Sequence, residues 1–312
     1  MYNGGRKAGG ESDRKGVECE LLQSAKKVEN YVEMIKPKVV LLLLMTGIAG
    51  MLVAYRSIGV TPSPTYLFIG SIALFLGSSG AEAITNYHDR DIDSIMERTK
   101  KRPIPSGRVG AKGALLFGII ASAVSVIISL WFNWLAALFM SIGLFDNVVV
   151  YSFWLKRRNW SSVIFGGISG GMPVLVGYSA IAGTISWVAV FMATLVVVWI
   201  PIHIWSLAIA EAEDYKLAGI PTLPETFGLQ VAFKCVVASS IILVSFGVAV
   251  FWLATMSPYL IAIGSLAGAA VAGYAVKLGL AKNKRVARNL FKISSPYLLL
   301  VFVLVLVGVW YA

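Results

Sequence analysis

The chain has 312 residues, of which 57% are hydrophobic and only 14% are charged, and its formal net charge is +11. Soluble domains carry roughly 25% charged residues. This composition, with a mean hydropathy of +0.77, therefore excludes an ordinary soluble domain and indicates a protein embedded in lipid. The basic excess follows the membrane topology derived below, so we expect no nucleic-acid partner. The two cysteines, Cys19 and Cys235, give no disulfide framework and no metal-ligand spacing.

The chain is expected to divide into a polar amino-terminal segment, residues 1–37, and a membrane domain, residues 38–312. The polar segment lacks a short apolar core followed by a small-residue cleavage site, so it does not resemble a secretory signal peptide. Residues 21–35 are expected to form a helix at the membrane interface.

Apolar stretches long enough to cross about 30 Å of hydrocarbon then occur at residues 39–56, 65–86, 113–132, 134–155, 161–182, 185–209, 229–253, 258–280 and 293–311. The predicted fold class is all-α, a polytopic bundle of about nine transmembrane helices around a central cavity.

Basic residues alternate between the two sides of this bundle. They gather before the first predicted helix at residues 36–38 and after even-numbered helices at residues 100–108, 156–158 and 282–288, whereas the opposite loops hold essentially only Arg56. Cytoplasmic loops carry the excess of Lys and Arg. We therefore expect a multi-pass protein of the cell membrane whose amino terminus and long polar loops are cytoplasmic.

The second predicted helix ends in the acidic sequence TNYHDRDID at residues 85–93. Steps of four residues advance about 40° around a helix, so Thr85, Asp89 and Asp93 share one face, with Asn86 beside them. Two carboxylates one turn apart repel each other in an apolar environment and need a cation. Magnesium fits, because it takes oxygen ligands and is commonly held by one or two carboxylates together with substrate phosphates.

A basic loop with turn residues, RTKKRPIPSGR at residues 98–108, follows these acids. An acidic face beside a basic loop suits a metal-bound diphosphate. The alternative is a helix end whose Asp and Arg residues pair with each other among the lipid headgroups. Asp91 is turned about 200° from Asp89, so we expect it to pair with Arg90, Arg98 or cations facing the lipid rather than with the metal.

The sixth predicted helix also ends in acidic sequence on the same side, EAEDYK at residues 211–216. Asp214 is the strongest ligand candidate, with Glu211 and Glu213 as weaker ones. His203 lies 11 residues before Asp214, which on a helix is about three turns deeper on nearly the same face.

His203 is therefore expected to point into the bundle beneath the acids. It is either a substrate or haem-iron contact or a buried histidine that forms a hydrogen bond between helices. Trp199 and Trp205 flank it, and such residues serve more often in packing or in the interfacial belt than in ligand stacking.

At these segments the chain resembles the UbiA superfamily of intramembrane prenyltransferases, and within it the haem-prenylating branch. Three stretches carry the resemblance. The first is NYHDRDID with RTKKRP, within residues 86–103, and the second is KRR at 156–158 with the glycine pairs at 166–167 and 170–171 and Pro173. The third runs from W-x-P-x-H-x-W at 199–205 through DY at 214–215 to AGIPTLP at 218–224. Two positions depart from the family pattern. Thr85 stands where Asn is usual, and Ala210 stands where the second motif usually has an Asp.

The resemblance implies transfer of the farnesyl group of farnesyl diphosphate to a vinyl group of haem b, with addition of water. It implies Mg²⁺ as the cofactor, haem b as a substrate, the lipid bilayer as the surroundings, and haem A synthase or the assembly of a terminal oxidase as a partner. The implied catalytic residues are Asp89, Asp93, Asp214, Lys101 and Arg102; the metal ligands are Asn86, Asp89, Asp93 and Asp214; the diphosphate is assigned to Arg98, Lys100, Lys101, Arg102, Lys156 and Arg157; and the acceptor is assigned to His203, Trp199, Trp205 and Tyr215.

Two other functions share parts of this pattern. A prenyltransferase with a quinone-precursor or lipid acceptor would have the same diphosphate site and would differ only in the acceptor cavity around His203. A secondary transporter would hold ionisable residues near the bilayer midplane, and Asp146 is such a residue unless Asn147 or Tyr151 satisfies it.

Overall fold

The computed structural model describes residue 20, residues 23–254 and residues 257–311. Within these ranges the protein is helical and has no strand, and nine segments are long and apolar enough to cross a membrane. The prediction of an all-α bundle is confirmed. The spans are α2 (Pro37–Ser57), α3 (Pro64–His88), α5 (Ala111–Phe132), α6 (Trp134–Phe145) continued by the π-helix η1 (Asp146–Leu155), α7 (Ser162–Phe165) with α8 (Ile168–Ala182), α9 (Trp187–Ala210), α11 (Leu223–Ala254), α12 (Pro258–Ala281) and α13 (Lys284–Tyr311).

The outer surface of this bundle is apolar. Trp131, Trp187 and Leu280 are 60%, 75% and 79% exposed, and many other large apolar side chains are also exposed. A water-soluble protein would rarely expose so much contiguous apolar surface. Lipid chains are therefore the natural neighbours of this face, as the hydropathy predicts.

Small residues allow the helices to approach closely inside the bundle. A Cβ atom placed on Gly50 of α2 would overlap the carbonyl oxygen of Val174 in α8, and one placed on Gly177 would overlap the carbonyl oxygen of Gly47. Because lipid supplies no hydrophobic force between helices, such close backbone packing is a main source of helix association in a membrane.

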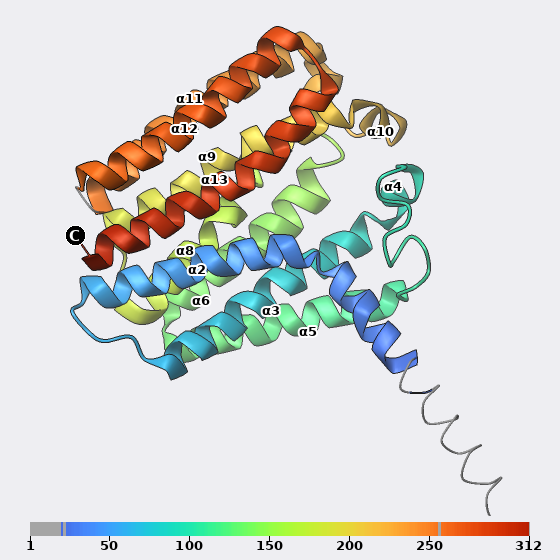
Figure 1. The fold of residues 1–312 in the computed structure, drawn as a ribbon. Coiled ribbons are helices and arrows are strands. Elements are labelled where there is room, and N and C mark those ends of the chain that lie inside the picture. Colours follow the sequence, from blue (N-terminus) through green and yellow to red (C-terminus); the bar gives the residue numbers. More distant parts are fainter. Residues whose placement is uncertain (1–19, 21–22, 255–256, 312) are drawn as a thin grey trace, which may run out of the picture.

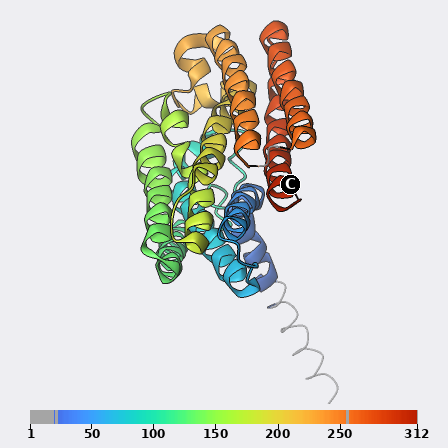
Figure 2. The same ribbon diagram turned by 90° about the vertical axis from the view of Figure 1, so that its left-hand side faces the viewer.

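The carboxyl-terminal helices form one side of the bundle. The largest buried apolar cluster joins residues of α2, α8 and α9 to residues of α11, α12 and α13. Figure 2 shows α12 and α13, in orange and red, on the opposite side of the molecule from the green helices. This cluster therefore covers the side of the bundle formed by the later helices, while α3, α5 and α6 contribute to smaller separate clusters.

Two short helices mark the end of the bundle where the acidic motifs lie. α4 (Arg90–Ile95) follows α3, and α10 (Ala212–Leu217) follows α9. Both stand at the same end of the molecule, beyond the ends of the long helices (Figure 1). The helix over residues 23–34 joins the bundle at this end, where Met34 and Ile35 pack with Ile104, Val109 and Ala114.

Asp146, the ionisable residue within the fourth span, is buried and has a hydrogen-bond partner. It is 5% exposed, and its carboxylate accepts a hydrogen bond of 2.7 Å from the backbone N–H of Ser169, in the first turn of α8. The sequence offered Asn147 or Tyr151 as the residue that could satisfy Asp146; the partner is instead a backbone amide at the positive end of a helix. Asp146 therefore joins α6 to α8.

Candidate active site

The first acidic motif forms one buried face, as the spacing predicts. α3 ends at His88 and α4 begins at Arg90, yet the Asp89 N–H donates to the Thr85 carbonyl at 2.9 Å and the Asp93 N–H donates to the Asp89 carbonyl at 2.8 Å. Thr85, Asp89 and Asp93 are 6%, 4% and 3% exposed. The helical register thus continues through the junction and holds both carboxylates on one face, one turn apart.

Each of these buried carboxylates contacts a cation from another segment. Lys156, just after η1, pairs with one oxygen of Asp89, and Arg102 Nη1 lies 2.7 Å from Asp93 Oδ2. The second oxygen of Asp89, Oδ1, is buried and has no hydrogen-bond partner among the described residues. A buried carboxylate oxygen without a partner is costly, and it is available to a bound cation.

The π-helix η1 brings the aromatic ring of Tyr151 to this site, a residue that the sequence analysis had considered only as a partner of Asp146. The Lys156 ammonium lies 5.6 Å from the centre of the Tyr151 ring. Burial alone would lower the pKa of Lys156, but the electrostatic influence of Tyr151 and Asp89 outweighs it and raises that pKa above its usual value. Lys156 is therefore a charged ammonium at neutral pH.

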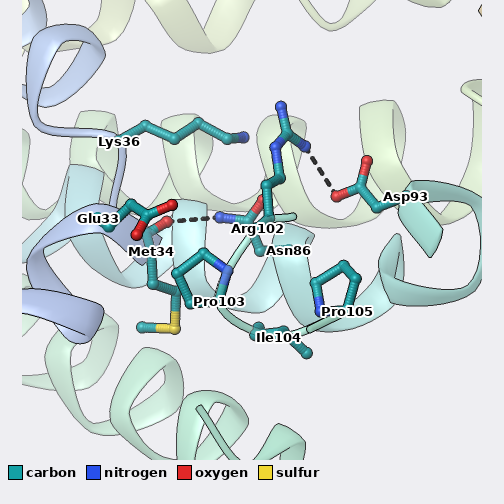
Figure 3. Close-up of a pocket in the computed structure, with 9 residues that line it drawn as sticks. All are labelled: Glu33, Met34, Lys36, Asn86, Asp93, Arg102, Pro103, Ile104 and Pro105. Atoms are coloured by element: carbon teal, nitrogen blue, oxygen red, sulfur yellow. Dashed lines mark hydrogen bonds and ion pairs between the residues drawn. The ribbon is translucent and has the colours of Figure 1, made fainter. Parts of the chain in front are cut away.

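The amino-terminal helix contributes to the site as well. The Asn86 amide nitrogen donates a 2.7 Å hydrogen bond to the carbonyl of Met34, which leaves the amide oxygen of Asn86 for a cation. The backbone of Lys36 is in the left-handed helical region, with φ 53°, and its Nζ lies 2.6 Å from Glu82 Oε2. Figure 3 shows Lys36, Asn86, Asp93 and Arg102 around one small pocket, whose floor is formed by the loop at residues 103–105.

Three of the predicted diphosphate ligands lie apart from this pocket. Arg157 forms two hydrogen bonds with Asp91 and one with the carbonyl of His88, so Asp91 pairs with a cation that the sequence analysis had assigned to the diphosphate. The hydrogen bond with Arg157 lowers the pKa of Asp91 to about 2. Lys100 pairs with the exposed Glu97, and Lys101 is exposed on the same loop.

Asp214 brings the two acidic loops together. One of its oxygens accepts a 3.0 Å hydrogen bond from the backbone N–H of Arg98. Glu211 Oε1 lies 2.8 Å from Arg288 Nη2, and Glu213 Oε1 lies 2.7 Å from Lys284 Nζ. Both basic residues stand at the beginning of α13. Both weaker ligand candidates are therefore engaged in ion pairs with α13.

The expected geometry between His203 and Asp214 is wrong. α9 ends at Ala210, Glu211 has φ −113° and ψ 28°, and α10 begins at Ala212, so no single helix joins the two residues. The distance between His203 and Asp214 therefore cannot be calculated by treating the 11 intervening steps as one continuous helix. His203 belongs to the contact of α9 with α13, while Asp214 belongs to the short helix α10.

His203 is packed between two aromatic rings. Its ring centre lies 4.4 Å from that of Trp199 and 4.2 Å from that of Phe291, and Nδ1 lies 2.8 Å from the Ser294 hydroxyl. Trp199 Nε1 donates to the Ser294 carbonyl at 2.9 Å. Both faces of the imidazole are covered, so a flat ligand could approach only its edge.

The other two predicted acceptor residues have different surroundings. Trp205 is 7% exposed, and its Nε1 has no hydrogen-bond partner among the described residues. Tyr215 packs against the cluster of Ile92, Met96 and Ile220, which joins α4 to the loop after α10. Tyr215 therefore connects the two motif loops, whereas Trp205 lies in the core of the bundle.

The residues present fit a magnesium ion that is completed by its substrate. Among the described residues no three His, Cys, Asp or Glu side chains form a ready-made cluster of ligands. Mg²⁺ is usually held by one or two carboxylates plus substrate phosphates and waters. The free Oδ1 of Asp89, the buried Asp93 and the amide oxygen of Asn86 are oxygen donors of the kind that such a site needs.

Solved structures with the same arrangement of helices define the class of fold. A structure from work on digeranylgeranylglyceryl phosphate synthase matches with a TM-score of 0.72 and 20% identity over 91% of this chain and 98% of that chain. A UbiA homologue from Archaeoglobus fulgidus, bound to DMAPP and Mg²⁺, matches with a TM-score of 0.63 and 19% identity over 88% and 99%. The fold is that of the UbiA proteins.

The chain belongs to the UbiA prenyltransferase family, which matches residues 43–296. It is 41% identical to the protoheme IX farnesyltransferase of Thermoplasma volcanium over 90% of this chain and 98% of that protein. It is 43% identical to protoheme IX farnesyltransferase 1 of Picrophilus torridus over 74% of this chain and 78% of that protein.

Proposed function

We propose that this protein is a membrane farnesyltransferase that converts haem b to haem O. In this reaction the farnesyl group of farnesyl diphosphate is joined to a vinyl group of the haem, water is added, and diphosphate is released. The observation that carries the proposal is the relationship to the Thermoplasma volcanium protoheme IX farnesyltransferase, which extends over 90% of this chain. The site described above supplies residues of the kinds that this chemistry needs.

The diphosphate is proposed to bind at the end of the bundle where α4 and α10 lie. Asn86, Asp89, Asp93 and Asp214 would hold Mg²⁺, which when bound supplies positive charge to the diphosphate oxygens. In the ligand-free protein Lys156 and Arg102 pair with Asp89 and Asp93. When a metal occupies the carboxylates, these two cations are close enough to turn toward the phosphate oxygens. Lys36, Arg98, Lys100, Lys101 and Arg157 complete the proposed cationic surroundings.

The residues act mainly on charge as the reaction proceeds. The bond between C1 of the farnesyl group and the bridging oxygen breaks, and its electron pair leaves with the diphosphate. Lys156 and Arg102, once turned toward the phosphate oxygens, would stabilise that developing negative charge. The vinyl group then forms the new carbon–carbon bond to C1, and the positive charge moves to the vinyl carbon next to the macrocycle.

Water completes the product at that carbon by adding a hydroxyl group and releasing a proton. Entry of water at an earlier stage would convert farnesyl diphosphate to a free alcohol. The apolar interior of the bundle, together with the hydrogen-bonded loops at its end, restricts this access. His203, Trp199, Trp205 and Tyr215 are proposed to line the acceptor side of the site, with His203 presenting only its ring edge.

The orientation in the membrane is part of the proposal. The basic loops at residues 98–108 and 156–158 and the start of α13 lie on the side that we assign to the cytoplasm, together with the amino terminus and the site. Residues 38–312 would be the catalytic membrane domain of a cell-membrane protein. A farnesylated haem remains in the bilayer, so haem A synthase or a terminal oxidase under assembly is the proposed recipient.

The acceptor class can be tested by competition. The purified protein in detergent is given labelled farnesyl diphosphate and Mg²⁺ together with haem b, a hydroxybenzoate or a polyprenyl glyceryl phosphate. We expect label to enter only the haem fraction. Transfer of label to the aromatic or lipid acceptor, with none to haem, would reassign the substrate while leaving the diphosphate site in place.

A further inference from the structure

A second hollow lies beside the diphosphate site, between the end of α9 and the beginning of α13. Its volume is about 340 Å³, and it is lined by Ala210, Glu211, Glu213, Asp214, Lys284, Arg285 and Arg288. We call it the α9–α13 hollow. Of its cations, Lys284 and Arg288 pair with Glu213 and Glu211, while the exposed side chain of Arg285 forms no ion pair with any residue that the structure describes.

One face of α13 connects this hollow to the aromatic cluster around His203. Steps of four and three residues place Lys284, Arg288 and Phe291 on the same face of a helix. The contacts agree with that spacing, because Lys284 and Arg288 reach the loop after α9, and Phe291 packs on His203. The cations therefore stand directly above the proposed acceptor residues.

The facing side of α9 carries a polar group without a partner. Trp199, His203, Ser206 and Ala210 follow the i, i+4, i+7, i+11 pattern of one helix face. Trp199 and His203 contact Ser294 of α13, and Ala210 lines the hollow. Ser206 lies between them, is 0% exposed, and its hydroxyl has no hydrogen-bond partner among the described residues. Buried hydroxyls are normally hydrogen-bonded, so Ser206 leaves an unpaired polar group on this face of α9, close to the hollow in helical position.

From this arrangement we infer that the α9–α13 hollow binds the two carboxylates of the porphyrin acceptor. The inference rests on the proposed function and names the part of the substrate that this surface recognises. Haem b carries two propionates on one edge and its vinyl groups toward the opposite edge. Arg285 and Lys284 offer charged donors to these carboxylates, while Arg288 remains paired with Glu211.

This binding would orient the macrocycle for reaction. Asp214 lines the hollow and also accepts the hydrogen bond from Arg98 of the first motif loop. A porphyrin held by its propionates at α13 would therefore direct its vinyl edge toward the diphosphate site. The charge of the propionates would decide which edge of the ring is presented to farnesyl C1.

The test compares haem b with its dimethyl ester, which has the same ring and vinyl groups but neutral propionates. The protein is Lys284→Gln/Arg285→Gln in the full chain, purified in detergent without anionic lipid. Arg288 is kept so that its ion pair with Glu211 still joins α13 to α9. The matched control is Lys292→Gln, which removes a charge from an exposed position of the same helix outside the hollow.

We expect the wild-type protein and Lys292→Gln to bind haem b at least about tenfold more tightly than the ester, as charge-assisted hydrogen bonds would give. In Lys284→Gln/Arg285→Gln this preference should disappear while binding of farnesyl diphosphate with Mg²⁺ is unchanged. A preference that survives in the double variant, or equal binding of both haems by the wild type, would overturn the inference and leave the proposed function standing. Failure of the wild type to bind either haem would overturn both.

Discussion

Asp89 and Lys156 allow the structural and chemical roles of one carboxylate to be separated. The Asp89 side chain is 6% exposed and that of Lys156 is 18% exposed, and the two form an ion pair. The substitution Asp89→Asn removes the negative charge and leaves the ammonium without its partner. It also removes the free carboxylate oxygen that we assign to Mg²⁺.

The loss of the ion pair and the loss of the proposed metal ligand differ in energy, and only the first can be offset by a second substitution. Removing one partner of a buried ion pair costs about 3–5 kcal/mol, and the remaining exposure of Lys156 favours the lower end, about 3 kcal/mol. Adding Lys156→Met removes the unpaired charge, so the double variant should return to within about 1 kcal/mol of the wild type. Loss of a metal ligand removes several kcal/mol of transition-state stabilisation, and about 4 kcal/mol corresponds to roughly a thousandfold in turnover.

The assay measures thermal unfolding in detergent and formation of haem O for the same preparations. Asp89→Asn should be both destabilised and inactive, whereas Asp89→Asn/Lys156→Met should be stable and still inactive. The control Glu225→Gln makes the same kind of change at an exposed position at the start of α11 and should change neither property. If the double variant regains turnover together with stability, Asp89 is no metal ligand and Lys156 is not needed to stabilise the departing diphosphate.

Three further predictions address the acceptor, the topology and the ion pairs. His203→Ala should raise the KM for haem b by about tenfold or more and leave the Kd of farnesyl diphosphate unchanged; weaker diphosphate binding would contradict this placement. In a background without the native cysteines, Ser106→Cys and Lys216→Cys should both react with a cytoplasmic reagent, and labelling of either only from outside would contradict the topology. Since Arg157 lowers the pKa of Asp91 to about 2, their pair stabilises the fold above about pH 4. The Tm difference between wild type and Asp91→Asn should therefore vanish as pH falls through 2, and persistence there would refute the pairing.

The membrane spans could be predicted from the sequence because lipid imposes a simple requirement. A helix must offer about 20 apolar residues to cross the bilayer, and this signal is local. The predicted stretch at 134–155 matches the described segment Trp134–Leu155, although hydropathy does not reveal that its second half is a π-helix. The last span begins earlier than expected, at Lys284, because its polar first turns are held by ion pairs outside the apolar stretch.

The candidate site could be predicted only where it depends on one helix. The shared face of Asp89 and Asp93 follows from helical spacing, and the structure shows it. The break at Glu211 does not follow, since Ala-Glu-Ala is compatible with a helix and the ion pairs of Glu211 and Glu213 with α13 come from distant sequence. The carbonyl of Met34 meets Asn86 across 52 positions, which no local pattern reports.

The most direct test of this account is the mass of the haem extracted after reaction. The purified protein is incubated with haem b, farnesyl diphosphate and Mg²⁺ in water labelled with heavy oxygen. The account predicts a haem that has gained one farnesyl group and one hydroxyl carrying the heavy isotope, formed by wild type and absent with Asp89→Asn/Lys156→Met. Release of diphosphate with the haem mass unchanged would contradict it.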